Sequence, residues 1–125
     1  MADQAIVEAV RHYIRVLNQE GILVEFAVLY GSHARGEETE WSDIDVMVVS
    51  SLFDGPKRRE DINHIWHATL QADVRIEPVG VGLRQWEAED RIPLIDIVRR
   101  EGLIIYPEAR SAMGFLKTTA PDAAL

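Results

Sequence analysis

The chain has 125 residues, 47% of them apolar and 27% charged, with a formal net charge of −8 at pH 7 and no cysteine. A chain of this length forms one domain. Its apolar runs are too short to span a bilayer, and the lack of cysteine excludes disulfides and thiolate chemistry. The negative charge argues against a protein that holds nucleic acid through clustered Lys and Arg, and without a signal-peptide pattern we expect a cytoplasmic protein.

The N-terminal segment 3–20 is predicted to form a helix. Asp3 can cap its start, and Gly21 ends it. The apolar residues that fall on one face at helical spacing are Ile6, Val7, Val10, Ile14 and Leu17. Residues 22–30 follow as a mostly apolar strand, which indicates that both of its faces are covered.

A glycine turn and a pair of aspartates come next. Gly31 lets the backbone turn sharply and lets a phosphate approach closely, and Ser32 adds a hydroxyl donor, so the turn is typical of a polyphosphate site. Residues 32–36 are predicted to form a short helical turn. Asp43 and Asp45 then open a second strand, and because strand side chains alternate, both carboxylates project from one face. Such a pair repels unless a cation lies between them, and carboxylate oxygens suit Mg²⁺ that carries substrate phosphates.

The second strand is predicted to cover residues 43–50, and a break follows at 51–56. A helix is predicted at 57–70. Its buried side is expected to hold Ile62, Ile65, Trp66 and Leu70.

The alternating segment 72–79 is predicted to be a third strand. Val74 and Ile76 occupy one side of it. The other side carries Asp73, Arg75 and Glu77. Pro78 removes one backbone donor, so the strand must end, bulge or lie at a sheet edge there.

A turn at 80–83 and a short helix at 84–89 precede a helix at 92–100, which has Pro93 in its first turn. The apolar set of that last helix is Leu94, Ile95, Ile97 and Val98. A short final strand is predicted at 103–106.

Two motifs resemble the signature of the DNA polymerase β-like nucleotidyltransferases: G-S-x-A-R-G at residues 31–36 and S-D-x-D-V at residues 42–46. They are most similar to the minimal, single-domain branch, whose members are often paired with HEPN-domain partners in prokaryotic toxin–antitoxin systems. The resemblance implies an α+β fold with a small mixed sheet and helices mainly on one face, and the predicted element order agrees. We assign residues 1–107 to this domain and 108–125 to a C-terminal tail.

Carried over to this chain, the resemblance makes Asp43 and Asp45 ligands of one or two Mg²⁺ ions. Glu77 becomes the third carboxylate, which completes the metal site and accepts the acceptor's proton. Asp73 is the alternative for that position, and a site with two working carboxylates is another.

The same resemblance places Gly31 and Ser32 against the β- and γ-phosphates. Arg35 either stabilises charge there or forms a salt bridge that fixes the loop, and both alternatives stay open. His33 occupies the variable position of the motif and receives no role.

The family attaches a nucleoside monophosphate from an NTP to an acceptor hydroxyl and releases pyrophosphate. For the minimal branch, the resemblance implies a protein adenylyltransferase that uses ATP to modify a tyrosine of a HEPN-type toxin partner, which is an antitoxin role. One alternative is a contact-neutralising or nucleotide-sensing module without catalysis. Another is a small-molecule nucleotidyltransferase that acts as a homodimer.

Overall fold

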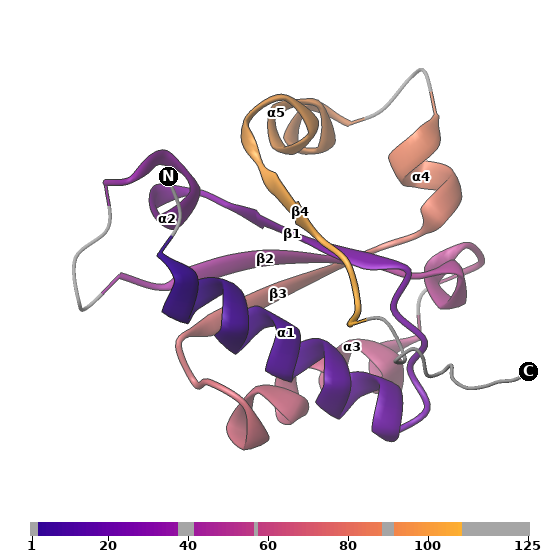
Figure 1. Cartoon of the computed structure of the whole chain (residues 1–125). Helices are drawn as coiled ribbons and strands as arrows, with labels where there is room; N and C mark the ends of the chain where they lie inside the picture. The colour runs from indigo at the N-terminus through magenta and orange to yellow at the C-terminus, as the bar shows by residue number, and fades with distance from the viewer. Residues whose placement is uncertain (1–2, 38–41, 57, 89–91, 109–125) are drawn as a thin grey trace, which may run out of the picture.

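The computed structural model of the chain describes residues 3–37, 42–56, 58–88 and 92–108. Within them, one sheet has the strand order β3-β2-β1-β4 (Figure 1). Its strands are β1 (Phe26–Tyr30), β2 (Ile44–Val49), β3 (Ile76–Val81) and β4 (Leu103–Ile105). β1 is antiparallel to β2 and β4, whereas β2 is parallel to β3. This mixed sheet with its helices confirms the predicted α+β class.

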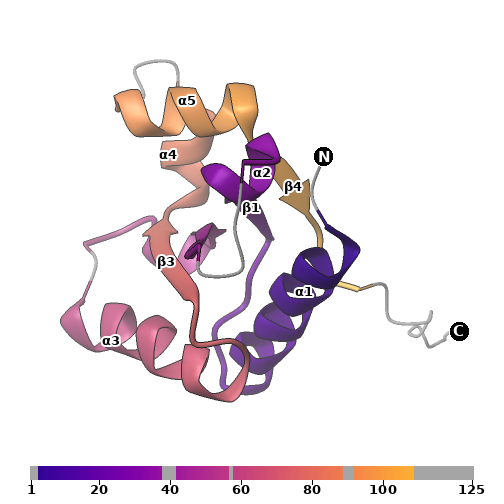
Figure 2. The same cartoon turned by 90° about the vertical axis from the view of Figure 1, so that its left-hand side faces the viewer.

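Helices pack on the two faces of the sheet. α1 (Gln4–Gln19) and α3 (Arg59–His67) lie against one face, and α4 (Leu83–Glu87) and α5 (Pro93–Glu101) lie on the other (Figures 1 and 2). The remaining short elements are α2 (Ser32–Arg35), η1 (Ser51–Phe53) and η2 (Ala68–Gln71). None of the helices in the described ranges combines the length and hydrophobicity needed to cross a membrane.

Each face of the sheet has its own apolar cluster, because the side chains of β1 and β2 alternate. The larger cluster, beneath α1 and α3, takes Leu29 and Val46 from the sheet. The smaller one, beneath α4 and α5, takes Val28 and Met47, with Ile95 from α5. Ile44 and Val46 therefore face away from Asp45 of the same strand, as the alternation predicts.

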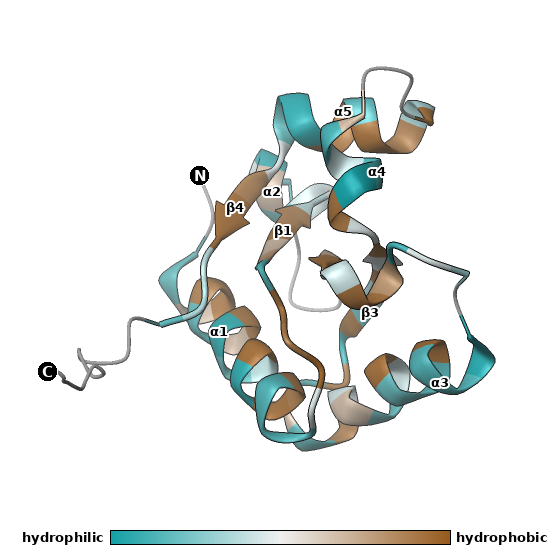
Figure 3. Cartoon of the chain, turned by 90° about the vertical axis from the view of Figure 1, so that its right-hand side faces the viewer, coloured by the Kyte–Doolittle hydropathy of each residue, from teal (hydrophilic) through white to brown (hydrophobic). Residues whose placement is uncertain are grey.

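The predicted N-terminal helix is confirmed. Asp3 caps α1 by accepting a hydrogen bond from the Ala5 amide at 2.9 Å, and Gly21 follows its end with φ +94°. Hydrophobic and hydrophilic positions alternate along α1 at helical spacing (Figure 3). The buried face also includes Tyr13, whose hydroxyl donates to the Ile65 carbonyl of α3. Burial raises the pKa of Tyr13, with a smaller contribution from the charge of Glu20.

Replacing Tyr13 by Phe is expected to lower the free energy of unfolding by about 1–2 kcal/mol, because a buried hydrogen bond between α1 and α3 is lost without loss of volume. Urea denaturation measures this difference. Tyr13 lies on the face opposite the aspartates, so nucleotide binding should not change. A variant as stable as the wild type would contradict a structural role for the hydroxyl.

The helix predicted at 57–70 changes its type before it ends. α3 stops at His67, and η2 continues it as a 3₁₀ helix, which turns by about 120° per residue instead of 100°. This phase change buries Ala68 and Thr69 and leaves Leu70 65% exposed. The prediction that Leu70 is buried is therefore wrong, and Trp66 is exposed as well.

The third strand lies further along the chain than predicted. Arg75 binds Asp73 through two side-chain hydrogen bonds of 3.0 and 2.7 Å, and the Ile76 amide donates to the Asp73 carbonyl, so the segment before β3 is a turn. Val74 is consequently exposed, not buried. At the other end β3 runs through Gly80, where a turn was predicted.

Pro78 lies within β3, and β3 is an edge strand, which was one of the predicted alternatives. The Ile44 amide donates to the Arg75 carbonyl, so alternate residues from Arg75 onward pair with β2. The nitrogen of Pro78 therefore faces the open edge, and no ladder hydrogen bond is lost.

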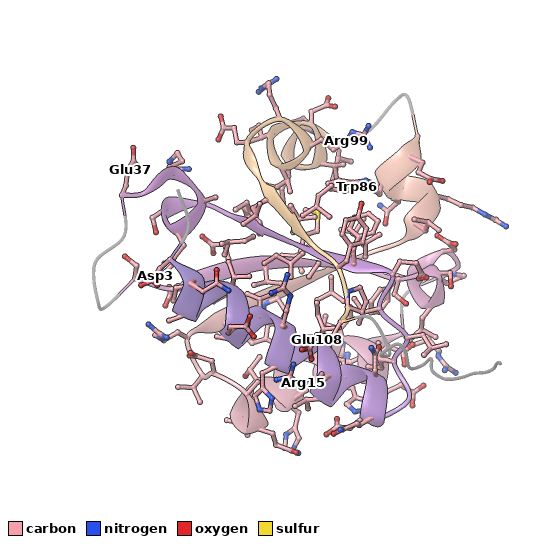
Figure 4. The ribbon with its side chains drawn as sticks, viewed as in Figure 1. Asp3, Arg15, Glu37, Trp86, Arg99 and Glu108 are labelled. Atoms are coloured by element: carbon pink, nitrogen blue, oxygen red, sulfur yellow. The ribbon has the colours of Figure 1, made fainter. Side chains whose placement is uncertain are left out.

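The C-terminal elements agree with the sequence in their order. Pro93 begins α5, and β4 follows Gly102. Leu94 and Ile97, predicted as part of the apolar set of α5, are exposed. Glu108 pairs with Arg15 of α1 (Figure 4). The rest of the predicted tail, residues 109–125, lies outside the described residues.

Candidate functional site

The candidate site lies where β1 ends and β2 and β3 begin. In the sheet register, Asp45 of β2 is the partner of Tyr30 on one side and of Glu77 on the other. Partners directly opposite each other in a sheet point to the same face. These side chains therefore form a row across three strands, on the face that carries α4 and α5.

Asp43 joins this row from the residue before β2 and hydrogen-bonds the Glu77 side chain. This hydrogen bond raises the pKa of Glu77, and burial and the charges of Asp43 and Asp45 raise it further. Burial also raises the pKa of Asp45, with a second contribution from the charge of Asp43. The three carboxyl groups therefore lie close enough together to disfavour one another's ionisation.

The predicted glycine turn adjoins these carboxylates. Gly31 has φ +76° and ψ −152°, a conformation that only glycine adopts readily, and α2 begins at Ser32. A Cβ atom at Gly31 would lie 2.2 Å from Oδ2 of Asp45. Gly31 therefore makes room for the Asp45 carboxylate. The sequence had suggested a different reason for the glycine, namely the close approach of a phosphate, and the two reasons are compatible.

The donor set of Asp43, Asp45 and Glu77 fits a divalent cation. Hard cations prefer carboxylate oxygens, and a bound cation would relieve the repulsion that raises the pKa values of Asp45 and Glu77. Among the described residues, no three acidic or histidine side chains already surround a common point at ligand distance. Asp43 and Glu77 instead contact each other.

Arg35 lies at the end of α2 and donates from Nε to Glu37 at 2.9 Å. This hydrogen bond raises the pKa of the guanidinium, and the charges of Glu101 and Asp45 raise it further. The structure thus shows an exposed salt bridge between Arg35 and Glu37, and Arg35 is also near enough to Asp45 for that charge to contribute to its raised pKa.

Asp73, the alternative third carboxylate, lies in the turn before β3. The hydrogen bonds from Arg75 lower its pKa, since they favour the ionised carboxylate. Its oxygens are engaged by that guanidinium, whereas Glu77 lies directly across from Asp45. This geometry favours Glu77 for the third position.

Two residues that the sequence reading did not select adjoin the site. Burial raises the pKa of Tyr30, and the charges of Asp45 and Glu77 raise it further, so its phenol lies beside the carboxylates. Continuing the side-chain alternation of the first strand as far as Gly31 could have identified Tyr30. His33 is buried and contacts the Ser42 carbonyl through Nε2 at 3.4 Å, which links α2 to the residue before Asp43. Nothing in the motif distinguishes that buried position.

Comparisons with known proteins agree with this geometry. A sequence-family profile described as a nucleotidyltransferase domain matches residues 10–104. That range includes both motifs and Glu77. No curated protein matches the sequence.

Two solved structures have a similar fold. One is a candidate nucleotidyltransferase from Sulfolobus solfataricus, with 15% identity, coverage of 83% of this chain and 82% of that chain, and a TM-score of 0.54. The other is a toxin–antitoxin structure with AMP-PNP, with 17% identity, coverage of 84% and 79%, and a TM-score of 0.55. At these identities the similarity shows the fold.

Proposed function

Because the chain belongs to the nucleotidyltransferase domain family, we propose that it transfers a nucleoside monophosphate, AMP from ATP, to an acceptor hydroxyl and releases pyrophosphate. The observation that carries this proposal is the cross-strand pairing of Asp45 with Glu77, with Asp43 hydrogen-bonded to Glu77 and Gly31 packed against Asp45. A row of carboxylates beside a glycine turn is what a metal-dependent transfer of a phosphate group requires.

Asp43, Asp45 and Glu77 are the residues that would hold Mg²⁺. When bound, the ion neutralises charge that develops on the phosphates and lowers the pKa of the attacking hydroxyl. Gly31 and Ser32 hold the terminal phosphates and so orient the α-phosphorus.

The bond changes in the reaction also require a proton acceptor. The acceptor oxygen forms a bond to the α-phosphorus, and the bond from that phosphorus to the oxygen bridging to the β-phosphorus breaks, so pyrophosphate leaves with the bonding electron pair. Glu77 takes the acceptor's proton.

We propose that the acceptor is a tyrosine of a HEPN-type toxin partner, and that this chain is the antitoxin. The toxin–antitoxin structure with AMP-PNP has the same fold and therefore supports this assignment over a small-molecule acceptor.

The test is transfer from α-³²P-ATP with Mg²⁺, with the protein alone and with a co-purified partner, and with release of pyrophosphate followed in parallel. Asp43→Asn/Asp45→Asn is the control. We expect a labelled partner band that the control lacks. If no nucleoside triphosphate labels any protein while the control still binds and neutralises the partner, the chain is a contact-neutralising module.

A further inference from the structure

His33 is a buried polar side chain in the middle of the glycine-turn motif. It follows Ser32 on the four-residue helix α2 and is only 3% exposed, although the residues that follow on α2 and after it, 35–37, are exposed. Burial of an imidazole costs free energy unless its ring nitrogens find hydrogen-bond partners. The burial of His33 therefore needs a reason that packing alone does not provide.

One ring nitrogen of His33 is hydrogen-bonded and the other is not. Nε2 lies 3.4 Å from the carbonyl oxygen of Ser42, and because a carbonyl oxygen can only accept, Nε2 carries the hydrogen and donates it. Nδ1 is buried and, among the described residues, has no hydrogen-bond partner. An apolar side chain of similar size would fill the same space without leaving a nitrogen unpaired. The contact with Ser42 thus distinguishes this histidine from a simple core residue.

The hydrogen bond joins the two halves of the candidate site. His33 directly follows Ser32 of the glycine turn, and Ser42 directly precedes Asp43. The Ser42 carbonyl and the Asp43 nitrogen belong to one planar peptide group, so fixing that carbonyl also fixes the plane from which Asp43 begins. α2 lies at the end of the sheet where β1 stops and β2 starts (Figure 1). His33 therefore connects the segment proposed to hold the terminal phosphates to the first carboxylate.

Asp43 is the carboxylate that most needs such a support. The sheet holds Asp45 from both sides, because its register partners are Tyr30 and Glu77. In the described ladders Asp43 precedes β2 and has no register partner. The imidazole of His33 also lies near Asp45: burial and the charge of Asp43 raise the pKa of Asp45, and charge on His33 opposes them. A buried ring at this place can hold the Asp43 backbone without touching a substrate.

We propose that His33 is a positioning residue, which donates from Nε2 to the Ser42 carbonyl and so holds Asp43 at the glycine turn for the binding of Mg²⁺ and nucleotide. This inference rests on the proposed function and gives a role to a variable position of the motif. Loss of an outer hydrogen bond that orients a metal ligand typically weakens metal binding by about 10–100-fold. Removal of the donor should accordingly lower the affinity for Mg²⁺ and leave the chemical step intact.

Two substitutions separate the hydrogen bond from the packing. His33→Leu fills a similar volume without a donor, whereas His33→Gln can place its side-chain amide near the position of Nε2. The Mg²⁺ concentration at half-saturation is measured from the rise in melting temperature during a Mg²⁺ titration, and again from transfer of label from α-³²P-ATP to the partner. We expect it to rise about tenfold or more in His33→Leu and to stay close to the wild-type value in His33→Gln. At saturating Mg²⁺ the transfer rate of His33→Leu should recover.

Tyr13→Phe is the matched control. It also removes one buried side-chain hydrogen bond to a backbone carbonyl, but on the face of the sheet away from Asp45. It should lower the melting temperature and leave the half-saturating Mg²⁺ concentration unchanged. If His33→Leu does not fold, His33→Asn takes its place, since the amide of Asn is one carbon shorter than that of Gln and does not reach the Nε2 position.

The inference fails if His33→Leu and the wild type are half-saturated at the same Mg²⁺ concentration while both transfer label. It also fails if His33→Gln is weakened as much as His33→Leu, because packing would then explain the effect. Equal weakening in Tyr13→Phe would trace the effect to lost stability and overturn the inference as well. A wild type that neither binds Mg²⁺ nor transfers label would refute the proposed function itself, and the inference with it.

Discussion

Asp45→Asn is expected to reduce nucleotidyl transfer by about a thousandfold or more and at the same time to make the metal-free protein more stable at pH 7. The loss of transfer follows from the loss of a charged ligand between Gly31 and Glu77, since metal-assisted charge stabilisation supplies several kcal/mol. The gain in stability follows from the raised pKa of Asp45, which burial and then the charge of Asp43 cause.

The sign of the stability change depends on pH. A carboxyl group whose pKa is raised on folding stabilises the fold while it is protonated and loses that contribution as the pH rises through the raised pKa. At pH 7 the ionised Asp45 therefore opposes folding, and an Asn at this position does not. Melting temperatures of the variant and the wild type should converge as the pH falls into the acidic range.

Asp73→Asn is the matched control, because the hydrogen bonds from Arg75 lower the pKa of Asp73. This carboxylate stabilises the fold above its unfolded pKa and loses that contribution as the pH falls, so its removal should lower the melting temperature at pH 7. Added Mg²⁺ should raise the melting temperature of the wild type and of Asp73→Asn, but much less that of Asp45→Asn. If Asp45→Asn keeps its transfer activity or melts earlier than the wild type, Asp45 has a structural role instead.

Gly31→Ala is expected to lower both activity and stability. The glycine-only backbone conformation costs a substituted residue about 1–3 kcal/mol. The new methyl group would also displace the Asp45 carboxylate, whose Oδ2 lies 2.2 Å from the Cβ position. Because a displacement of about 1 Å in a site can cost roughly a hundredfold in rate, we expect at least that loss in kcat/KM.

Gly21→Ala separates the two effects of the Gly31 substitution. Gly21 also has a positive φ, +94°, but a Cβ atom there has open space around it. Gly21 follows the C-terminal end of α1, which packs on the sheet face opposite Asp45. We expect Gly21→Ala to lose stability in urea denaturation and to keep its kcat/KM. Equal rate losses in the two variants would show that stability alone explains them.

The sequence predicted most of the secondary structure, because it depends on local patterns, and the structure brings the predicted candidate residues Asp43, Asp45 and Glu77 together. Strand alternation put Asp43 and Asp45 on one face, and the edge position of β3 accounts for Pro78, but only the register shows that Glu77 lies beside Asp45. The errors arose where a tertiary contact or a change of helix type overrides the burial that the periodicity of apolar residues predicts. Leu70 is exposed because η2 shifts the phase.

A second kind of error concerns Leu94 and Ile97. An apolar helix position predicts burial, yet only the side of α5 toward the sheet is buried, and periodicity alone cannot tell which side that is. His33 shows the reverse case, because a polar residue of α2 in a variable motif position is buried.

The alternation of β2 also governs how the protein can accumulate substitutions. Ile44, Val46 and Val48 belong to the larger apolar cluster, whereas Asp45 lies on the other face of the same strand. A change at one of these even-numbered positions is therefore expected to disturb the packing of the core, whereas a change at Asp45 acts directly on the candidate site. A deletion of one residue in β2 would exchange the two sets, carrying a carboxylate into the core and an aliphatic side chain into the candidate site. Homologous chains should therefore tolerate length variation in the segment between α2 and β2 but not within β2 itself.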